Sequence, residues 1–225
     1  MESVLFTLSV IFSFIYVSCW AYVPQLSNHL LSDNTRVLLG SIIKPLPIIL
    51  FSIIAFSRQS KKSKYSTSRY TALALALSSV GDVLLDLDTS NNYYFLAGLS
   101  FFLLAHLVYA ISFAEYNISH SWINACLFSL LPFVSISIHW QGIPSSLRFA
   151  VFIYSCVIAY MAYVSFSAKL GDKRLRALIG VFLFIVSDSM LALDRFGPVR
   201  IPQAKFLVMI TYYSSQYMLL SFCVR

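Results

Sequence analysis

Charged residues are scarce in this sequence. They make up 11% of the 225 residues, whereas 59% are hydrophobic; soluble domains are about 25% charged and about 45–50% apolar. A soluble core of this size cannot cover so much apolar surface, but a lipid bilayer can. The composition therefore excludes an ordinary soluble domain. We attribute the net charge of +7 to basic loops that orient a membrane protein, not to a nucleic-acid-binding surface.

The motifs of several enzyme classes are also missing. The four cysteines (Cys19, Cys126, Cys156 and Cys223) show no C-x-x-C spacing, so we expect neither disulfides nor a cysteine metal site. No histidine occurs in an H-E-x-x-H pattern, which argues against a zinc hydrolase. The G-x-S-x-G, Walker A and Rossmann glycine patterns are absent. We therefore expect no metal and no cofactor.

The apolar runs predict an all-α, polytopic membrane helical bundle with about eight transmembrane helices, because about 20 apolar residues span a bilayer. The N-terminal run lacks a basic n-region and an A-x-A cleavage site, which favours a retained first span over a cleaved signal peptide. Residues 1–225 are expected to form a single transmembrane domain. The predicted spans are 3–22, 36–57, 70–88, 92–114, 122–140, 147–168, 176–195 and 203–223.

The basic residues predict the orientation in the membrane. Two basic loops, 58–69 and 169–176, follow the second and sixth spans, and the positive-inside rule places both in the cytoplasm. The N- and C-termini are then cytoplasmic as well. Lys and Arg residues in the loops, in the tails and at the span ends number ten on the cytoplasmic side and five on the outer side, which leaves Lys44 within the membrane. The membrane would be a bacterial inner membrane, or the endoplasmic reticulum in a eukaryote, and the sequon at Asn117 would stay unglycosylated.

A short internal repeat links the third and seventh spans. Residues 81–88 read G-D-V-L-L-D-L-D and residues 187–194 read S-D-S-M-L-A-L-D, with four of eight positions identical. Asp82 and Asp188 each follow the start of their span by twelve residues, so they are expected at the same depth. The spacing predicts two parallel four-helix half-repeats, 1–115 and 116–225.

Among Asp, Glu, Lys and Arg, three residues lie deep inside predicted spans, away from the span ends: Lys44, Asp82 and Asp188. Each costs roughly 2.5–3.5 kcal/mol at a helix centre. Lys44 lies at a depth from which it can contact either aspartate. A buried ion pair that only fixes helix packing is one alternative. However, two acids and one base leave one carboxyl over, and in a low dielectric that carboxyl tends to stay protonated. One neutral and one ionised acid are what general acid–base catalysis requires.

Further polar residues gather in the fourth and eighth spans. They are His106 and Tyr109 in the fourth, and Tyr212, Tyr213 and Gln216 in the eighth. We interpret them as supporting or substrate-binding residues, although each could instead be a helix–helix packing contact.

Near the outer helix ends lies a second polar group, made of Asp86, Asp88, Asp194 and Arg195. These residues are expected to be solvated helix ends or rim ion pairs, with lipid-headgroup contact as the alternative. A phosphate would favour a cation, Arg195, Arg200 or Lys205, over the acids.

The chain resembles the YhhN-like lysoplasmalogenase family of membrane proteins. The resemblance implies hydrolysis of the vinyl-ether bond of a lysoplasmalogen, a lysophospholipid, to a fatty aldehyde and glycerophospho-ethanolamine or -choline. It also implies a metal-free reaction with Asp82 and Asp188 as the catalytic pair. The matching residues are Lys44-Pro45-Leu46, Gly81-Asp82, Leu84-Leu85, Gly98, Phe101, His106-Leu107-Val108-Tyr109, Ser187-Asp188, Leu191 to Phe196, Tyr212-Tyr213 and Gln216.

Vinyl-ether chemistry fits these residues independently. Protonation of the β-carbon gives an oxocarbenium ion to which water adds, so one acid and one carboxylate are needed; glycosidases solve a related problem with two carboxylates. The main alternative is a proton-coupled membrane transporter of a small or lipid-like solute, which parallel repeats and intramembrane acids would also suit. An intramembrane aspartyl protease is less consistent, because Ser79-Val80-Gly81-Asp82 lacks its G-x-G-D motif. A lipid-binding scaffold would leave the paired acids unexplained.

Overall fold

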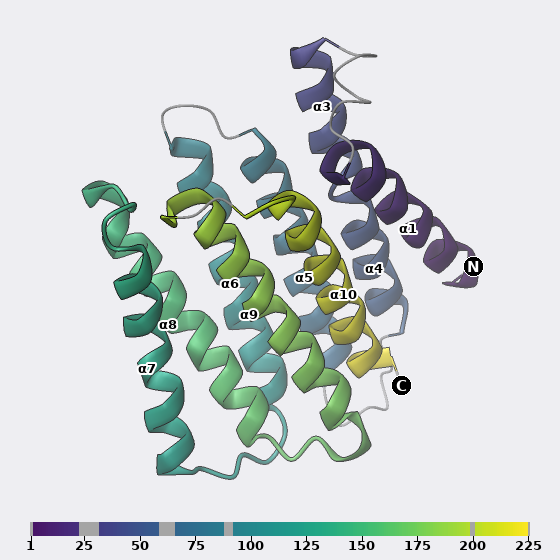
Figure 1. Ribbon diagram of the computed structural model, residues 1–225. Coiled ribbons are helices and arrows are strands. Elements are labelled where there is room, and N and C mark those ends of the chain that lie inside the picture. Colours follow the sequence, from purple (N-terminus) through teal and green to yellow (C-terminus); the bar gives the residue numbers. More distant parts are fainter. Residues whose placement is uncertain (1, 23–31, 59–65, 88–91, 199–200, 225) are drawn as a thin grey trace.

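The computed structural model describes residues 2–22, 32–58, 66–87, 92–198 and 201–224 (Figure 1). All the regular elements in these ranges are helices, and the predicted all-α architecture is confirmed. They are α1 (Glu2–Tyr16), the π-helical η1 (Val17–Tyr22), α3 (Asp33–Ile43), α4 (Leu46–Ser57), α5 (Thr67–Asp86), α6 (Tyr93–Ala114), α7 (Trp122–His139), α8 (Ser145–Ser167), the 3-10 turn η2 (Gly171–Lys173), α9 (Arg174–Phe196) and α10 (Ala204–Val224).

Six helical segments of the described chain are long and apolar enough to cross a membrane. Two further helices, α5 and α10, are as long but less apolar, and they are not among these six. The membrane-protein class is therefore confirmed, while the predicted number of eight spans stays a prediction. The six segments are 2–21, 35–57, 93–114, 122–139, 145–167 and 171–196.

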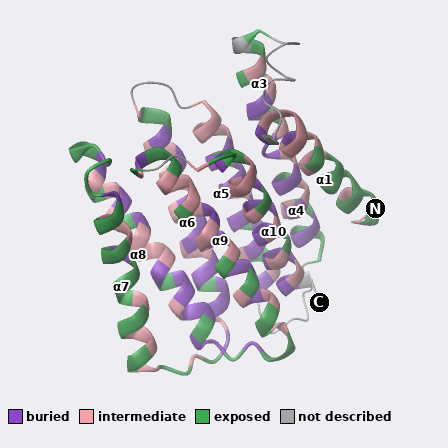
Figure 2. Cartoon of the chain, viewed as in Figure 1, coloured by how far each residue is buried: buried purple, intermediate pink, exposed green. Residues whose placement is uncertain are grey.

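Burial separates peripheral from central helices. In the apolar 18-residue stretch of the first segment only 17% of the residues are buried, and in that of α7 only 11%. The corresponding share for α6 is 44%. In Figure 2 the exposed residues accordingly gather on α1 and α7, at opposite sides of the bundle. Such exposed apolar faces are expected of helices that contact lipid, whereas the polar helices α5 and α10 are covered by neighbours.

The second predicted span, 36–57, corresponds to a candidate span over 35–57 that contains a turn. Lys44 and Pro45 form this turn, between α3 and α4. Pro45 and Pro47 have no N–H, and a proline ring clashes with the preceding helical turn. The turn frees the Lys44 carbonyl oxygen, which accepts a hydrogen bond from the Tyr213 hydroxyl at 2.9 Å. The buried backbone oxygen is thereby satisfied from α10.

Two glycines, Gly81 on α5 and Gly98 on α6, let these two helices approach closely next to Asp82. A Cβ added to Gly81 would lie 2.7 Å from the Phe102 ring and 3.3 Å from the Gly98 carbonyl oxygen. A Cβ on Gly98 would lie 3.2 Å from the Gly81 carbonyl oxygen. Any larger residue at Gly81 would therefore separate the helices. Gly81 precedes Asp82, so this close contact fixes the position of that carboxyl.

Contacts between chain segments define one end of the bundle. The Arg58 side chain at the end of α4 pairs with Glu2 at the start of α1. The α6–α7 and α8–η2 connections meet in an isolated antiparallel bridge between Ile118 and Ala168. In Figure 1 the C-terminus lies toward this end as well. Because both ends of the chain lie toward this end of the bundle, the arrangement agrees with an even number of membrane crossings. Lys61, Lys62 and Lys64 of the predicted basic loop lie outside the described residues.

Candidate active site

A cavity of about 420 Å³ lies among α5, α6, α7, α8, α9 and α10, beside Lys44 in the α3–α4 turn, and both sequence-predicted aspartates line it. Its walls are mainly apolar, but polar side chains reach it from the α3–α4 turn and from five of these helices. The polar and charged lining residues are Lys44, Asp82, Asp86, Ser135, His139, Tyr154, Ser155, Ser187, Asp188, Ser189, Asp194, Arg195, Lys205 and Tyr212. A mostly apolar cavity with a few convergent polar groups is the usual form of a small-molecule site.

Asp82, on α5, is the most deeply buried of these acids, with 2% of its side chain exposed. Its Oδ2 atom accepts a hydrogen bond from the Tyr212 hydroxyl at 2.8 Å. Its Oδ1 atom lies 3.7 Å from the ammonium nitrogen of Lys44. The carboxyl is thus held by one neutral donor and one cation, so the predicted contact of Lys44 with Asp82 is confirmed.

The closest partner of Lys44, however, is Asp86. Lys44 Nζ lies 3.0 Å from Asp86 Oδ1, and the Tyr16 hydroxyl donates to Asp86 Oδ2 at 3.0 Å. Only 13% of the Asp86 side chain is exposed. Asp86 was expected to be a solvated helix end or a rim ion pair; it does form an ion pair, but with the buried Lys44 and not in solvent. Four residues separate Asp86 from Asp82, so both side chains project from the same face of α5. One ammonium group consequently faces two carboxyl groups.

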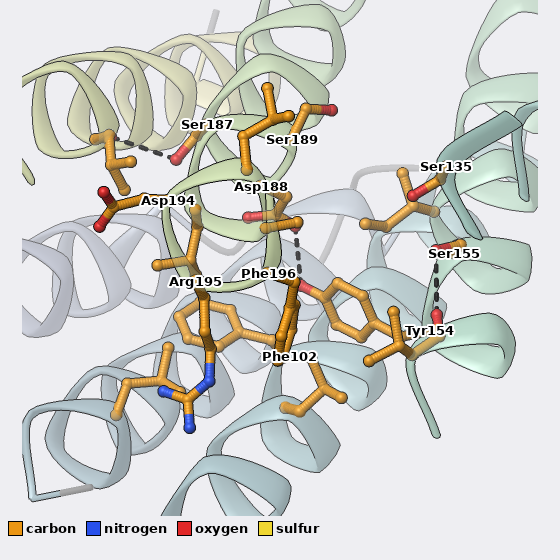
Figure 3. A pocket seen from close by; sticks show the side chains of 18 of the residues that line it. Phe102, Ser135, Tyr154, Ser155, Ser187, Asp188, Ser189, Asp194, Arg195 and Phe196 are labelled. Atoms are coloured by element: carbon orange, nitrogen blue, oxygen red, sulfur yellow. Dashed lines mark hydrogen bonds between the residues drawn. The ribbon is translucent and has the colours of Figure 1, made fainter. Parts of the chain in front are cut away.

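Asp188, on α9, has a different environment. Its Oδ2 atom accepts a hydrogen bond from the Tyr154 hydroxyl of α8 at 2.7 Å, as Figure 3 shows. His106 Nε2 lies 3.5 Å from the same oxygen but outside hydrogen-bonding geometry, and it has no hydrogen-bond partner among the described residues. His106 Nδ1 lies 2.5 Å from the Phe102 carbonyl oxygen, so this nitrogen must carry a proton. Among the described residues, no lysine pairs with Asp188 as Lys44 pairs with Asp82.

The two aspartates are bound by equivalent helices. Asp82 contacts Lys44, beside α4, and Tyr212 on α10; Asp188 contacts Tyr154 on α8 and His106 on α6. The second and fourth helices of each predicted half-repeat therefore supply the partners. The partner from α6 or α10 always comes from the opposite half. The packing is what parallel half-repeats would produce, with the site at their interface; the duplication itself stays a prediction.

Other sequence-predicted residues lie behind the cavity wall. Tyr109 and Gln216 are fully buried and joined by a hydrogen bond of 2.7 Å from the tyrosine hydroxyl to the amide oxygen. Tyr213 is buried and holds the backbone at Lys44. Neither these three residues nor His106 line the cavity. They can position the helices that carry the acids, but they cannot reach a ligand in this conformation.

Charged residues surround the outer end of the cavity. Asp194 and Arg195 are exposed at the end of α9, as expected, and both line the cavity. The Arg195 guanidinium stacks 3.8 Å above the Phe95 ring and donates to Asn92 at 2.8 Å. Lys205 lies at the start of α10, also exposed. Asp88 and Arg200 lie outside the described residues.

Sequence reasoning missed Tyr16 and Tyr154 and misassigned Asp86. The spacing of Asp86 from Asp82 was a usable signal, since residues four apart share a helix face. For Tyr154 the signal was weaker: it follows Lys44 by 110 residues, the same separation as between His106 and Gln216. Nothing in the sequence pointed to Tyr16, because an isolated tyrosine in a first span usually marks an interface.

Comparisons with known proteins agree on one family. The YhhN family model matches residues 39–222. Lysoplasmalogenase TMEM86B of Sus scrofa is 30% identical over 184 residues, which is 82% of this chain and 75% of that protein. Lysoplasmalogenase TMEM86A is 27% identical in Bos taurus and 25% in Homo sapiens, each over 64% of this chain and 60% of that protein. No solved structure matches the chain.

Proposed function

Because this chain belongs to the YhhN family, we propose that it is a lysoplasmalogenase, a membrane hydrolase that cleaves the vinyl-ether bond of a lysoplasmalogen. The observation that carries the proposal is the meeting of Asp82 and Asp188 in one apolar cavity, with unlike partners. The family relationship supports the substrate class, since the relatives are named lysoplasmalogenases.

The charge arrangement supports Asp82 as the acid. One ammonium group, Lys44, serves two carboxyls, and in a low dielectric one of the two keeps its proton. Asp86 is nearer to Lys44 Nζ, at 3.0 Å, and more exposed, whereas Asp82 is 3.7 Å away and 2% exposed. The proton therefore belongs on Asp82. Asp188, 15% exposed and beside His106 and Tyr154, is then the carboxylate.

The reaction follows from these two states. Asp82 donates its proton to the β-carbon of the vinyl ether, which leaves an oxocarbenium ion at the α-carbon. Asp188 takes a proton from the water that adds to this carbon and forms a hemiacetal. Asp188 then returns a proton to the glycerol oxygen as the C–O bond breaks, and Asp82 takes the hydroxyl proton. The fatty aldehyde and glycerophospho-ethanolamine or -choline then leave, and both aspartates are back in their starting protonation states.

The cavity wall explains how an apolar chain enters. Leu131, Val134 and Ile138 of α7 line the cavity, yet more than a third of each side chain is exposed on the bundle surface. The cavity thus reaches the face that contacts lipid. A fatty alkenyl chain can pass between α7 and its neighbours without crossing water.

The proposed activity is tested with purified, monodisperse protein in detergent micelles containing lysoplasmenyl-ethanolamine, by measuring released aldehyde. A hydrolase turns over without a membrane gradient, whereas a proton-coupled transporter does not. Aldehyde release at a rate proportional to protein supports the proposal. Absence of release from both ethanolamine and choline substrates, by protein that stays folded, would leave transport as the better function.

We expect EDTA to leave this activity unchanged. Among the described residues, no three His, Cys, Asp or Glu side chains gather as a metal-binding group. The proposed steps use only carboxyl groups and water. Aldehyde release is compared before and after chelation and gel filtration. A loss that zinc or another divalent ion restores would contradict the proposed mechanism.

The proposed orientation puts both termini and loops 58–69 and 169–176 in the cytoplasm, from the distribution of Lys and Arg. Lys169→Cys and Ser146→Cys place thiols in exposed segments at opposite ends of the bundle. In intact cells a membrane-impermeant maleimide should label position 146 but not position 169. Labelling of 169 with protection of 146 would reverse the orientation.

A further inference from the structure

The outer end of the cavity contains two cations placed alike on adjacent helices. On α9, Arg195 follows Asp188 by seven residues; on α10, Lys205 precedes Tyr212 by seven. Seven residues are two helical turns, a rise of about 10.5 Å. The two helices run in opposite directions, so both cations lie outward from the level of the aspartates. All four side chains line the same cavity.

Lys205 is the cavity cation whose charge remains available. Lys44 is occupied by Asp86 and Asp82 at 3.0 and 3.7 Å. Within the described parts of the chain, no carboxylate lies within 4.0 Å of the Lys205 ammonium nitrogen; it lies 5.5 Å from the centroid of the Tyr16 ring, and the Asp86 carboxylate attracts it from beyond ion-pair distance. A ring attracts a cation without neutralising it. An exposed ammonium group at the mouth of an apolar cavity favours an anionic ligand.

Apolar side chains of all the surrounding helices line the cavity, including Phe95 of α6 and Met209 of α10. Those on α7, Leu131, Val134 and Ile138, are also exposed on the surface of the bundle, so the hydrocarbon part of a ligand has its way out on this side. A ligand that fills the cavity therefore has an anionic end at Lys205 and Arg195 and a hydrocarbon end toward α7. The reactive bond would lie between them, at the level of Asp82 and Asp188.

We propose that Lys205, assisted by Arg195, binds the phosphodiester of the lysolipid and so sets which bond reaches the two aspartates. The proposal rests on the proposed function. Six bonds separate the phosphorus from the vinyl-ether α-carbon, about 7–8 Å when extended. The two helical turns between Lys205 and the level of the aspartates match this length once the reach of the lysine side chain is included. The Arg195 guanidinium, held on Phe95 and bonded to Asn92, lines the same end of the cavity.

The test compares two substrates that share the vinyl ether. One is lysoplasmenyl-ethanolamine; the other is the corresponding alkenylglycerol, which lacks the phosphate. Lys205→Gln should raise the KM for the phospholipid roughly tenfold or more, with kcat nearly unchanged, because a hydrogen-bonded charge contributes about 1.5–3 kcal/mol. The KM for the alkenylglycerol should not change. Substrate is varied as mole fraction in mixed micelles of fixed detergent concentration.

Lys169→Gln is the matched control, since Lys169 is exposed at the opposite end of the bundle. It should leave both KM values unchanged. If Lys205→Gln alters neither KM, or raises both equally while the wild type hydrolyses both substrates, the phosphate assignment is wrong. If the wild type hydrolyses neither substrate, the proposed function itself fails, so the two failures are distinguishable.

Competition distinguishes a lipid headgroup from free phosphate. Glycerophosphoethanolamine, which carries the phosphodiester, should inhibit competitively in the wild type and lose potency in Lys205→Gln. Inorganic phosphate lacks the glycerol and should compete far less. Competition by inorganic phosphate without competition by glycerophosphoethanolamine would assign these cations to free phosphate and overturn the headgroup assignment.

Discussion

Asp82→Asn and Asp188→Asn are each expected to lower the rate of aldehyde release by a hundredfold or more. Asparagine can neither donate the proton that Asp82 supplies nor accept the proton that Asp188 takes, and such proton transfers contribute about 10²–10⁴-fold. Both steps belong to one sequence, so the double variant should be scarcely worse than either single variant. The measurement is kcat with matched amounts of purified protein.

Folding should survive both changes, because asparagine keeps the size of the side chain. Tyr212 and Tyr154 can still donate to its amide oxygen, as they do to Asp82 and Asp188. Asp172→Asn is the matched control, since Asp172 is exposed in η2, away from the cavity. Asp194→Asn, at the cavity mouth, should be milder than either cavity variant. Substantial activity in Asp82→Asn or Asp188→Asn would disprove the two-aspartate mechanism.

Lys44→Met is expected to lower kcat about a hundredfold, the cost of removing one preorganised charge from an active site. After Asp82 gives up its proton, the ammonium 3.7 Å away stabilises the new carboxylate. Without Lys44, Asp82 must form an uncompensated charge in an apolar cavity, which is costly. Methionine keeps the length of the side chain, so the cavity wall should remain intact.

A second variant separates catalysis from folding. Lys44→Met leaves Asp86 without its partner, which alone could reduce the yield of folded protein. Lys44→Met/Asp86→Asn removes the ion pair as a whole and should recover yield and thermal stability, but not kcat. Full recovery of kcat in the double variant would mean that Lys44 serves only to compensate Asp86. Yield is followed by size-exclusion chromatography, and activity by aldehyde release.

The unlike surroundings of the two aspartates are more informative than their shared cavity. If a lysine faced each of the two acids, both would be held as carboxylates and neither would keep a proton. If no cation lay near either acid, a carboxylate would be hard to maintain in apolar surroundings. Lys44 with Asp86 on one side, and His106 with Tyr154 on the other, give the two carboxyls separate roles. Environments that divide acid from base in this way are typical of catalytic carboxyl pairs.

Helix positions and both aspartates could be predicted from the sequence because their causes are local. An apolar run of about 20 residues must span or be buried, and a carboxyl within it is costly wherever the chain packs. The repeat of residues 81–88 and 187–194 also predicted that Asp82 and Asp188 lie at one level, and both line the same cavity. The turn at Lys44 and Pro45 inside the second span was not predicted, although the prolines that cause it stand in the sequence.

Only the tertiary structure decided which side chains meet the aspartates. Tyr16 and Asp86 are 70 residues apart, Tyr154 and Asp188 are 34 apart, and Asp82 and Tyr212 are 130 apart. Such contacts depend on the rotation of each helix about its own axis, which is set by packing such as that of Gly81 against Gly98. A sequence specifies which faces are polar, but the partner of a polar face is chosen only when all the helices have packed.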